Sequence, residues 1–270
     1  MCGIGGYVLR DLAPTVPEAV DRFLGALRTR GPDDEGVVLV DRPDGVIRHC
    51  RTDRSAPALA PHLEPLTALR GVRHNVAIVN ARFAIADRRA EAHQPFVSRC
   101  GTVVGAFHGE IYNYPELGRE LEAAGVALRT RGDTEVLIEG YRLWGDALWP
   151  RLNGFWAVLL YDGRTRRVVI SRDRLGVAPL YVRETAQGIF FASTIRPLIA
   201  ADPAPVHVHP AVLAGFIDTE LKDVDAATCF QEIQTFPAAT TLTLAGDTPV
   251  ADGRHSRYWA VPAAPLRPAD

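Results

Sequence analysis

The chain has 270 residues, of which 47% are hydrophobic, and a formal net charge of -2 at pH 7. A chain of this length forms one large domain or two small ones, and it can bury a core without disulfides or metals. The small net charge argues against a general nucleic-acid binder, and no apolar run reaches the roughly 18 residues that a membrane span needs.

Strand and helix signals are mixed in the first half of the chain. Apolar residues recur at helical spacing between Val20 and Leu27, which predicts a helix over 17–29. Residues 51–73 contain several prolines and no clear period, so we interpret them as a surface insertion with one helical turn at 66–69. Strands are predicted over 3–9, 35–40, 75–85 and 101–107.

Two helices are predicted in the middle of the chain, over 115–124 and 134–144. Pro115 begins the first and Gly125 follows it, and Asp133 is expected to cap the second. Many strands joined by short turns, with helices in separate groups, predict an α+β layered fold. The later elements are a helix over 209–219 and strands over 155–161, 167–171, 180–182, 189–192 and 241–245.

The cysteines bear on the compartment and on possible metal sites. All four are far apart, and none forms a C-x-x-C pair, so neither a zinc site nor a dense disulfide framework is expected. The N-terminus lacks the basic and apolar stretches of a signal peptide. We therefore expect a cytoplasmic protein in which Cys2 is a free thiol. The remaining three are expected to be packing residues: Cys50, Cys100 and Cys229.

Cys2 is a candidate nucleophile because of its place in the chain. Removal of Met1 would leave Cys2 with a free α-amino group beside its own thiol. Such an amine has a pKa of about 7.7–8.0 and is partly unprotonated at neutral pH, so a terminal cysteine can carry its own general base. Its position alone would favour a Cys2 without a special role, but the neighbouring motifs favour Cys2 as the nucleophile.

Six sequence blocks, in this order, resemble the class II glutamine amidotransferases, and their asparagine synthetase branch is the most similar. The resemblance covers about residues 1–259 and implies the N-terminal-nucleophile hydrolase fold, a four-layer αββα sandwich of two antiparallel sheets. It also implies a glutaminase domain over 1–200, with a C-terminal extension and linker over 201–270. The blocks are MCGIGG at 1–6, RGPDDEG at 30–36, NARFAIAD at 80–87 (followed by HQP at 93–95), HGEIYN at 108–113, GDTE at 132–135 and SRDRLGVAPLY at 171–181.

The resemblance assigns the catalytic steps to three positions. Cys2 would attack the glutamine carboxamide to form a thioester, with its α-amino group taking the thiol proton. The backbone N–H of Gly109 would form half of the oxyanion hole. The family places an asparagine side chain as the second donor, but this chain has His108 there. A neutral imidazole has one N–H donor and an imidazolium two, so the charge state of His108 is expected to matter for activity.

The resemblance also implies a set of substrate-binding residues. Arg82 would pair with the α-carboxylate of glutamine, because a planar guanidinium binds a carboxylate through two hydrogen bonds. Ala84 and Ile85 follow it in the same block and would lie at the substrate. Glu110 and Asp133 would hold the α-ammonium group. The simpler alternatives are a surface ion pair for Arg82 and a helix cap for Asp133.

No phosphate-binding motif accompanies these blocks. Neither an S-G-G-x-D-S run nor a G-x-x-x-x-G-K-S/T loop occurs, so no cofactor is expected in this chain, and ATP and magnesium are expected only on a separate synthetase domain or subunit. We expect hydrolysis of L-glutamine to glutamate and ammonia, with ammonia passed to that partner. Two alternatives stay open: a catalytically impaired glutaminase-fold scaffold, and an N-terminal-nucleophile amidohydrolase acting on another amide.

Overall fold

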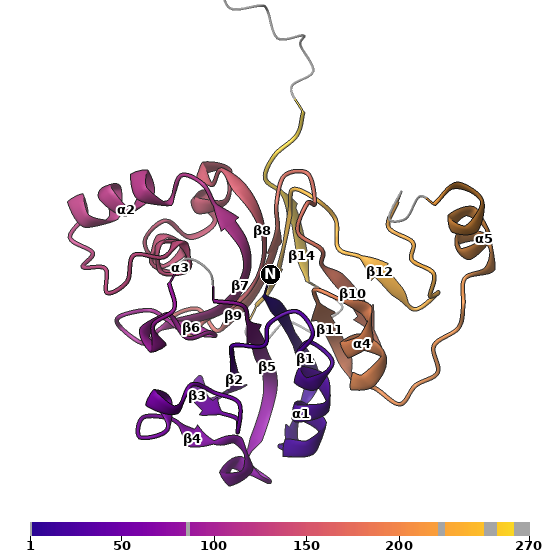
Figure 1. Ribbon diagram of the computed structural model, residues 1–270, viewed down its shortest axis with the longest axis horizontal. Coiled ribbons are helices and arrows are strands. Elements are labelled where there is room, and N and C mark those ends of the chain that lie inside the picture. The colour runs from indigo at the N-terminus through magenta and orange to yellow at the C-terminus, as the bar shows by residue number, and fades with distance from the viewer. Residues whose placement is uncertain (1, 85–86, 221–224, 246–252, 262–270) are drawn as a thin grey trace, which may run out of the picture.

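Two β-sheets are stacked face to face, with helices on the outer side of each (Figure 1). The computed structural model describes residues 2–84, 87–220, 225–245 and 253–261. The first sheet has the strand order β12-β10-β11-β1-β5-β2-β3-β4. Its neighbours are antiparallel except for the parallel pair β3 and β4. Its strands are β1 Gly3–Pro14, β2 Asp34–Asp41, β3 Val46–Arg51, β4 Glu64–Pro65, β5 Arg73–Arg82, β10 Tyr181–Glu184, β11 Gly188–Ala192 and β12 Ile233–Thr235.

The second sheet is antiparallel, with the order β14-β13-β9-β8-β7-β6. Helices α2 and α3 cover its outer face, and α1 and α4 cover the outer face of the first sheet (Figure 1). Its strands are β6 Phe96–Val97, β7 Val103–Ile111, β8 Gly154–Asp162, β9 Arg167–Arg172, β13 Thr240–Leu244 and β14 Arg254–Arg257. The helices are α1 Pro17–Gly25, α2 Tyr114–Ala123, α3 Asp133–Trp144, α4 Ile195–Ala201 and α5 Pro210–Thr219, with 3-10 turns at Pro57–Leu59, Leu66–Leu69, Ala90–Ala92 and Gly145–Arg151.

Separate hydrophobic cores fill the gaps between the layers. One core lies between the sheets, one between the second sheet and α2 and α3, and one between the first sheet and α1 and α4. Strand β7 contributes to two of them because its side chains alternate between its faces. Val104 and Ala106 enter the core between the sheets, whereas Val103 and Phe107 pack on the helical side. The four predicted layers are therefore confirmed.

The block at 171–181 is a structural connection between the two sheets. The Asp173 carboxylate accepts hydrogen bonds from the backbone N–H groups of Val177 at 3.0 Å and Ala178 at 2.9 Å. The Arg172 guanidinium donates to the carbonyls of Ala178 at 2.7 Å and Gly176 at 2.6 Å. These contacts fix the turn that leads from β9 in one sheet to β10 in the other.

Two expectations about local structure are wrong. The strand predicted to end at 107 continues to Ile111, because its antiparallel ladder with β8 does not require apolar side chains and runs through Gly109 and Glu110. Asp133 does not cap α3: Gly132 occupies the N-cap position and Asp133 begins the helix. The Asp133 carboxylate instead accepts a hydrogen bond from the Ile111 N–H at 3.1 Å.

The C-terminal part of the chain contributes to both sheets. Strand β12 pairs with β10, and β13 pairs with β9. Helix α5 lies apart from the layers and has no buried residue (Figure 1). The division of the chain near residue 200 stays a prediction. Within the described ranges, no helix combines the length and the apolar character needed to cross a membrane.

Candidate active site

One pocket lies where the start of β1, the end of β5, the C-terminal half of β7 and the start of α3 meet. The strand register places the start of β1 beside the end of β5, since Gly3 pairs with Ala81. The predicted residue Ile85 lies outside the described residues. The pocket lining contains all the other residues predicted for the site: Cys2, Arg82, Ala84, His108, Gly109, Glu110 and Asp133.

The Cys2 thiol is partly buried against the segment that follows β5. Its sulfur accepts a hydrogen bond from the Phe83 N–H at 3.3 Å and lies 3.6 Å from the Phe83 carbonyl oxygen. Burial raises the pKa of the Cys2 thiol, and the Phe83 N–H and the charge of Arg82 oppose that rise in part. The group is therefore a thiol at neutral pH, so it needs a base to become a nucleophile.

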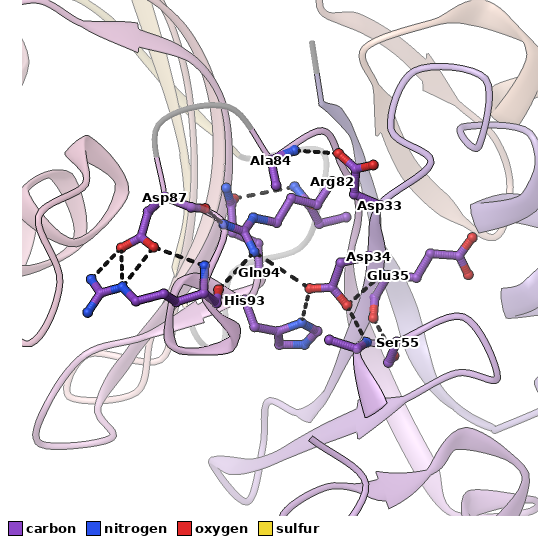
Figure 2. A network of polar contacts seen from close by, with 12 residues as sticks. Asp33, Asp34, Glu35, Ser55, Arg82, Ala84, Asp87, His93 and Gln94 are labelled. Carbon is purple, nitrogen blue, oxygen red and sulfur yellow. Dashed lines mark hydrogen bonds and ion pairs between the residues drawn. The ribbon is translucent and has the colours of Figure 1, made fainter. Parts of the chain in front are cut away.

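Arg82 ends β5 with its guanidinium inside the protein, and only 6% of the residue is exposed. It donates to the carbonyl oxygens of Arg89, at 3.2 Å, and Asp87. The nitrogen that donates to Arg89, Nη1, also lies 4.0 Å from an oxygen of the Asp34 carboxylate (Figure 2). Arg82 is thus a pocket residue in a fixed position, and the alternative of a surface ion pair is wrong.

Acidic residues of the RGPDDEG block support this side of the pocket. The Asp33 carboxylate accepts a hydrogen bond from the Ala84 N–H at 2.8 Å, and the Asp34 carboxylate lies 2.7 Å from Nδ1 of the buried His93 (Figure 2). Gln94 accepts from the Phe107 N–H at 2.7 Å and so joins this network to β7. Sequence reasoning gave these residues no roles; the only signal was that they lie in matching blocks.

His108 lies on the face of β7 that points toward the first sheet, and its side chain is almost completely buried. Its Nε2 is 3.3 Å from a terminal nitrogen of Arg30, whose Nε donates to the Cys2 carbonyl at 3.2 Å. Burial, helped by the charge of Arg30, lowers the pKa of His108 to about 3. The ring is therefore neutral at physiological pH, and the expectation that its titration controls activity near neutrality is wrong.

Gly109 follows His108 with a φ of +146°, which side-chain-bearing residues rarely adopt. A Cβ at this position would lie 2.0 Å from the carbonyl oxygen of Phe155 in the neighbouring strand. Both constraints require glycine. The backbone of β7 can therefore line the pocket directly, as an oxyanion hole made of backbone N–H groups requires.

Two carboxylates also line the pocket, those of Glu110 and Asp133. Burial raises the pKa of Asp133 to about 6, with the Ile111 N–H opposing this and the charge of Glu110 adding to it. The pocket lining thus brings together a guanidinium, two carboxylates and a thiol. This arrangement suits a zwitterionic amino acid whose side chain reaches the thiol. Among the residues that the structure describes, no group of three or more His, Cys, Asp or Glu side chains is placed to hold a metal ion.

Comparison with known proteins identifies the family. Residues 69–259 match the model of the glutamine amidotransferase domain. The chain is 26% identical over 265 residues to asparagine synthetase (glutamine-hydrolyzing) 3 of Bacillus subtilis, covering 97% of this chain and 37% of that protein. It is 30% identical over 255 residues to a putative asparagine synthetase (glutamine-hydrolyzing) of Mycobacterium tuberculosis, covering 90% of this chain and 33% of that protein. The chain thus spans about a third of the length of these two relatives.

Solved structures show the same fold. The glutamine phosphoribosylpyrophosphate amidotransferase from B. subtilis superposes with a TM-score of 0.65 at 19% identity, covering 96% of this chain and 49% of that one. A second structure, an allosteric regulatory enzyme of purine biosynthesis, gives a TM-score of 0.67 at 18% identity, covering 96% and 49%. Together with the family match, this shows that the chain belongs to the glutamine amidotransferase family and is a class II, asparagine synthetase-like glutamine amidotransferase domain.

Proposed function

We propose that this domain hydrolyses L-glutamine to glutamate and ammonia with Cys2 as nucleophile, and that the ammonia serves an ATP-dependent, asparagine synthetase-like amide-forming partner. One observation carries the proposal. A single pocket collects the thiol of Cys2, the cation of Arg82 and the carboxylates of Glu110 and Asp133, although these residues are far apart in sequence. Each charged group has its complement in zwitterionic glutamine.

The proposed reaction starts from a chain that begins at Cys2. The α-amino group takes the thiol proton, and the sulfur adds to the carboxamide carbon, so that the carbonyl oxygen becomes an oxyanion. The Gly109 N–H and the ring of His108 stabilise that oxyanion. When the carbon–nitrogen bond breaks, the α-ammonium group returns its proton to the leaving ammonia. Water then cleaves the thioester and releases glutamate.

The partner is inferred from the relatives. They are named glutamine-hydrolyzing asparagine synthetases, and about two thirds of their length lies outside the region that this chain covers. We place ATP and magnesium on that partner, whether it is a separate subunit or another part of the same polypeptide. Free ammonia is mostly protonated at neutral pH, so a docked partner would use it better than one supplied through solvent.

The test is a parallel assay of glutamate and ammonia from purified protein and glutamine. Equal molar release of both products is expected for a glutaminase. The competing function, an impaired scaffold, is motivated by His108 in place of asparagine. No release with or without a candidate synthetase, from protein shown by mass to begin at Cys2, would favour the scaffold.

Arg82→Lys is expected to raise KM for glutamine at least about tenfold and to change kcat less. Lysine keeps the charge but loses the planar fork that pairs with a carboxylate, so the loss falls mainly on ground-state binding. Steady-state kinetics of glutamate release measures both constants. Arg10→Lys is the matched control, because Arg10 forms a surface ion pair with Glu184 outside the pocket. An unchanged KM in Arg82→Lys would exclude Arg82 from carboxylate binding.

The raised pKa of Asp133 predicts a pH effect on binding. KM for glutamine is expected to increase as pH falls below about 6, since the protonated carboxyl no longer attracts the α-ammonium group. In Asp133→Asn, KM is expected to be high and nearly independent of pH in that range. Kinetics between pH 5 and 8 checks this. A wild-type KM that stays constant over the whole range would contradict the role of Asp133.

The same shift predicts an effect on stability that serves as the control. Because the pKa in the folded state lies above the ordinary value of 3.8, ionisation of Asp133 destabilises the fold. Asp133→Asn is therefore expected to raise the free energy of unfolding at pH 7 by on the order of 1–3 kcal/mol. This gain largely disappears as pH falls below both pKa values, to about 3, where the carboxyl is mostly protonated in the folded and the unfolded state. Denaturant titrations at the two pH values separate weakened binding from misfolding.

A further inference from the structure

We propose that Arg30 is a positioning residue that holds His108 in one neutral tautomer, with the proton on Nδ1, so that Nδ1–H is the donor offered to the oxyanion formed at Cys2. The inference rests on the proposed function and adds a residue to which the resemblance gave no role. It starts from the 3.3 Å contact between a terminal nitrogen of Arg30 and Nε2 of His108.

The chemistry of the two groups determines the direction of this hydrogen bond. A guanidinium has five N–H donors and no acceptor, and it stays protonated in proteins. Nε2 must therefore accept, which requires a lone pair on that nitrogen. A neutral imidazole with a lone pair on Nε2 carries its proton on Nδ1. The other tautomer, and the imidazolium, would each place two donors against one another.

The environment of the ring supports the same state. Burial and the neighbouring positive charge lower the pKa of His108 to about 3, so the ring is neutral where the enzyme would work. Nδ1 has no hydrogen-bond partner among the residues that the structure describes. His108 and Gly109 line the same pocket as Cys2, so a free Nδ1–H is available to a ligand there.

Arg30 is held in a way that suits this role. Its Nε donates to the Cys2 carbonyl at 3.2 Å, so one planar group contacts both the backbone of the nucleophile and the proposed oxyanion donor. The next residue, Gly31, packs so closely on β5 that a Cβ would lie 2.1 Å from the Ala81 carbonyl oxygen. This packing fixes the backbone that carries the guanidinium. Lysine has no planar fork and would not make both contacts.

The arrangement also explains why this chain needs such a device. An asparagine amide, which the family pattern has at this position, always has an NH₂ donor. A histidine ring offers a donor from Nδ1 in one neutral tautomer and from Nε2 in the other. Without a partner that selects one tautomer, the donor would face the oxyanion for only part of the time. Arg30 would matter more with His108 than with an asparagine at the same position.

Nuclear magnetic resonance of protein labelled with ¹⁵N-histidine tests the tautomer without measuring activity. His108→Asn identifies the signals of His108 by their loss. At pH 7 the wild type is expected to show a protonated Nδ1 and an unprotonated Nε2 for this ring. Arg30→Met is expected to shift both nitrogens toward the average of two exchanging tautomers. Arg10→Met, which removes a surface arginine, is expected to leave them unchanged.

A double-mutant cycle tests the consequence for catalysis. In the wild-type background, Arg30→Met is expected to lower kcat by about 10²-fold, close to the loss of one oxyanion donor. In the His108→Asn background the same change is expected to cost less than about tenfold, since asparagine needs no tautomer selection and only the contact with Cys2 is lost. Arg30→Lys keeps a group that can only donate but does not make both contacts, so its loss in the wild-type background is expected to be smaller than that of Arg30→Met.

The results separate this inference from the proposed function. A wild-type ring protonated on Nε2, or equal losses in the two backgrounds, would overturn the role of Arg30 even if the protein hydrolyses glutamine. The Nδ1–H tautomer in a protein that releases no glutamate would support the contact and reject the function. The wild-type spectrum alone decides the tautomer if Arg30→Met does not fold.

Discussion

Replacing Cys2 with alanine is expected to abolish glutamate release, with a fall in rate of about 10⁴-fold or more, while the fold is retained. The sulfur is partly buried, and among the residues that the structure describes its hydrogen bonds go only to the backbone of Phe83. Its removal should therefore change the free energy of unfolding by about 1 kcal/mol or less. The measurement pairs the glutamate assay with a denaturant titration of both proteins.

Cys100→Ala is the matched control. Cys100 is exposed, so the expectation that it packs in the core is wrong, and it lies outside the pocket lining. Full activity is therefore expected. A diazoketone analogue of glutamine should label Cys2 and spare the other cysteines, although Cys100 is the more exposed thiol. If the cysteines are labelled in proportion to their exposure, the pocket neither binds the analogue nor activates the Cys2 thiol.

If the α-amino group of Cys2 is the base, Met1 must be removed from the active protein. Burial raises the pKa of the Cys2 thiol, so an adjacent base is needed at neutral pH. The proposed base is the α-amino group of Cys2, which exists only after removal of Met1. Intact mass measurement of active protein should show that removal. Active protein that retains Met1 would contradict the base assignment while leaving Cys2 as the nucleophile.

Much of the fold follows from local sequence patterns, and the exceptions share a cause. Apolar spacing between Val20 and Leu27 correctly indicates α1, although the helix ends at Gly25 and a turn follows. Strand β6 has two residues and pairs with β7, which follows it in the chain, whereas β12 has three residues and pairs with the distant β10. Such strands carry too few residues for a periodic pattern, so sequence reasoning does not find them.

The site shows the same division between local and non-local information. Motif order identified Cys2, Arg82 and Asp133, and the fold places all three in one pocket. Their electrostatic states depend on burial and on contacts between distant segments. Arg30 and His108 are 78 positions apart, and their contact accompanies a lowered histidine pKa that residue type alone does not suggest. The sequence-based expectation of a ring titrating near neutrality therefore failed.

His108→Ala is expected to lower kcat by about 10²–10³-fold, the usual cost of one oxyanion-hole donor. Alanine removes the ring and leaves only the backbone donor of Gly109. His108→Asn should keep or raise activity, because an amide N–H replaces the ring N–H at the position where the family has asparagine. Glutamate release by the three proteins, with unfolding measured in parallel, provides the comparison.

The dependence on pH separates a structural from a titrating role for this ring. With a pKa of about 3, His108 stays neutral from pH 5 to 9, so it adds no ionisation to the activity profile. The acidic fall in kcat should instead follow protonation of the Cys2 amine, whose ordinary pKa is about 7.7–8.0. Wild type and His108→Asn are therefore expected to share the same acidic limb. A limb that moves when His108 is replaced would mean that the ring titrates in the working range after all.

The three rates also decide between the active enzyme and the scaffold. If His108 supplies a donor, the rate of His108→Asn is expected to equal or exceed that of the wild type, and both rates should be far above that of His108→Ala. If the domain is impaired at this position, wild type and His108→Ala should be equally slow and only His108→Asn active. Equal rates for all three would place residue 108 away from the oxyanion, which its position beside Gly109 in the pocket lining argues against. Activity would then rest on the Gly109 N–H alone, and Arg30 would serve only to hold the Cys2 backbone.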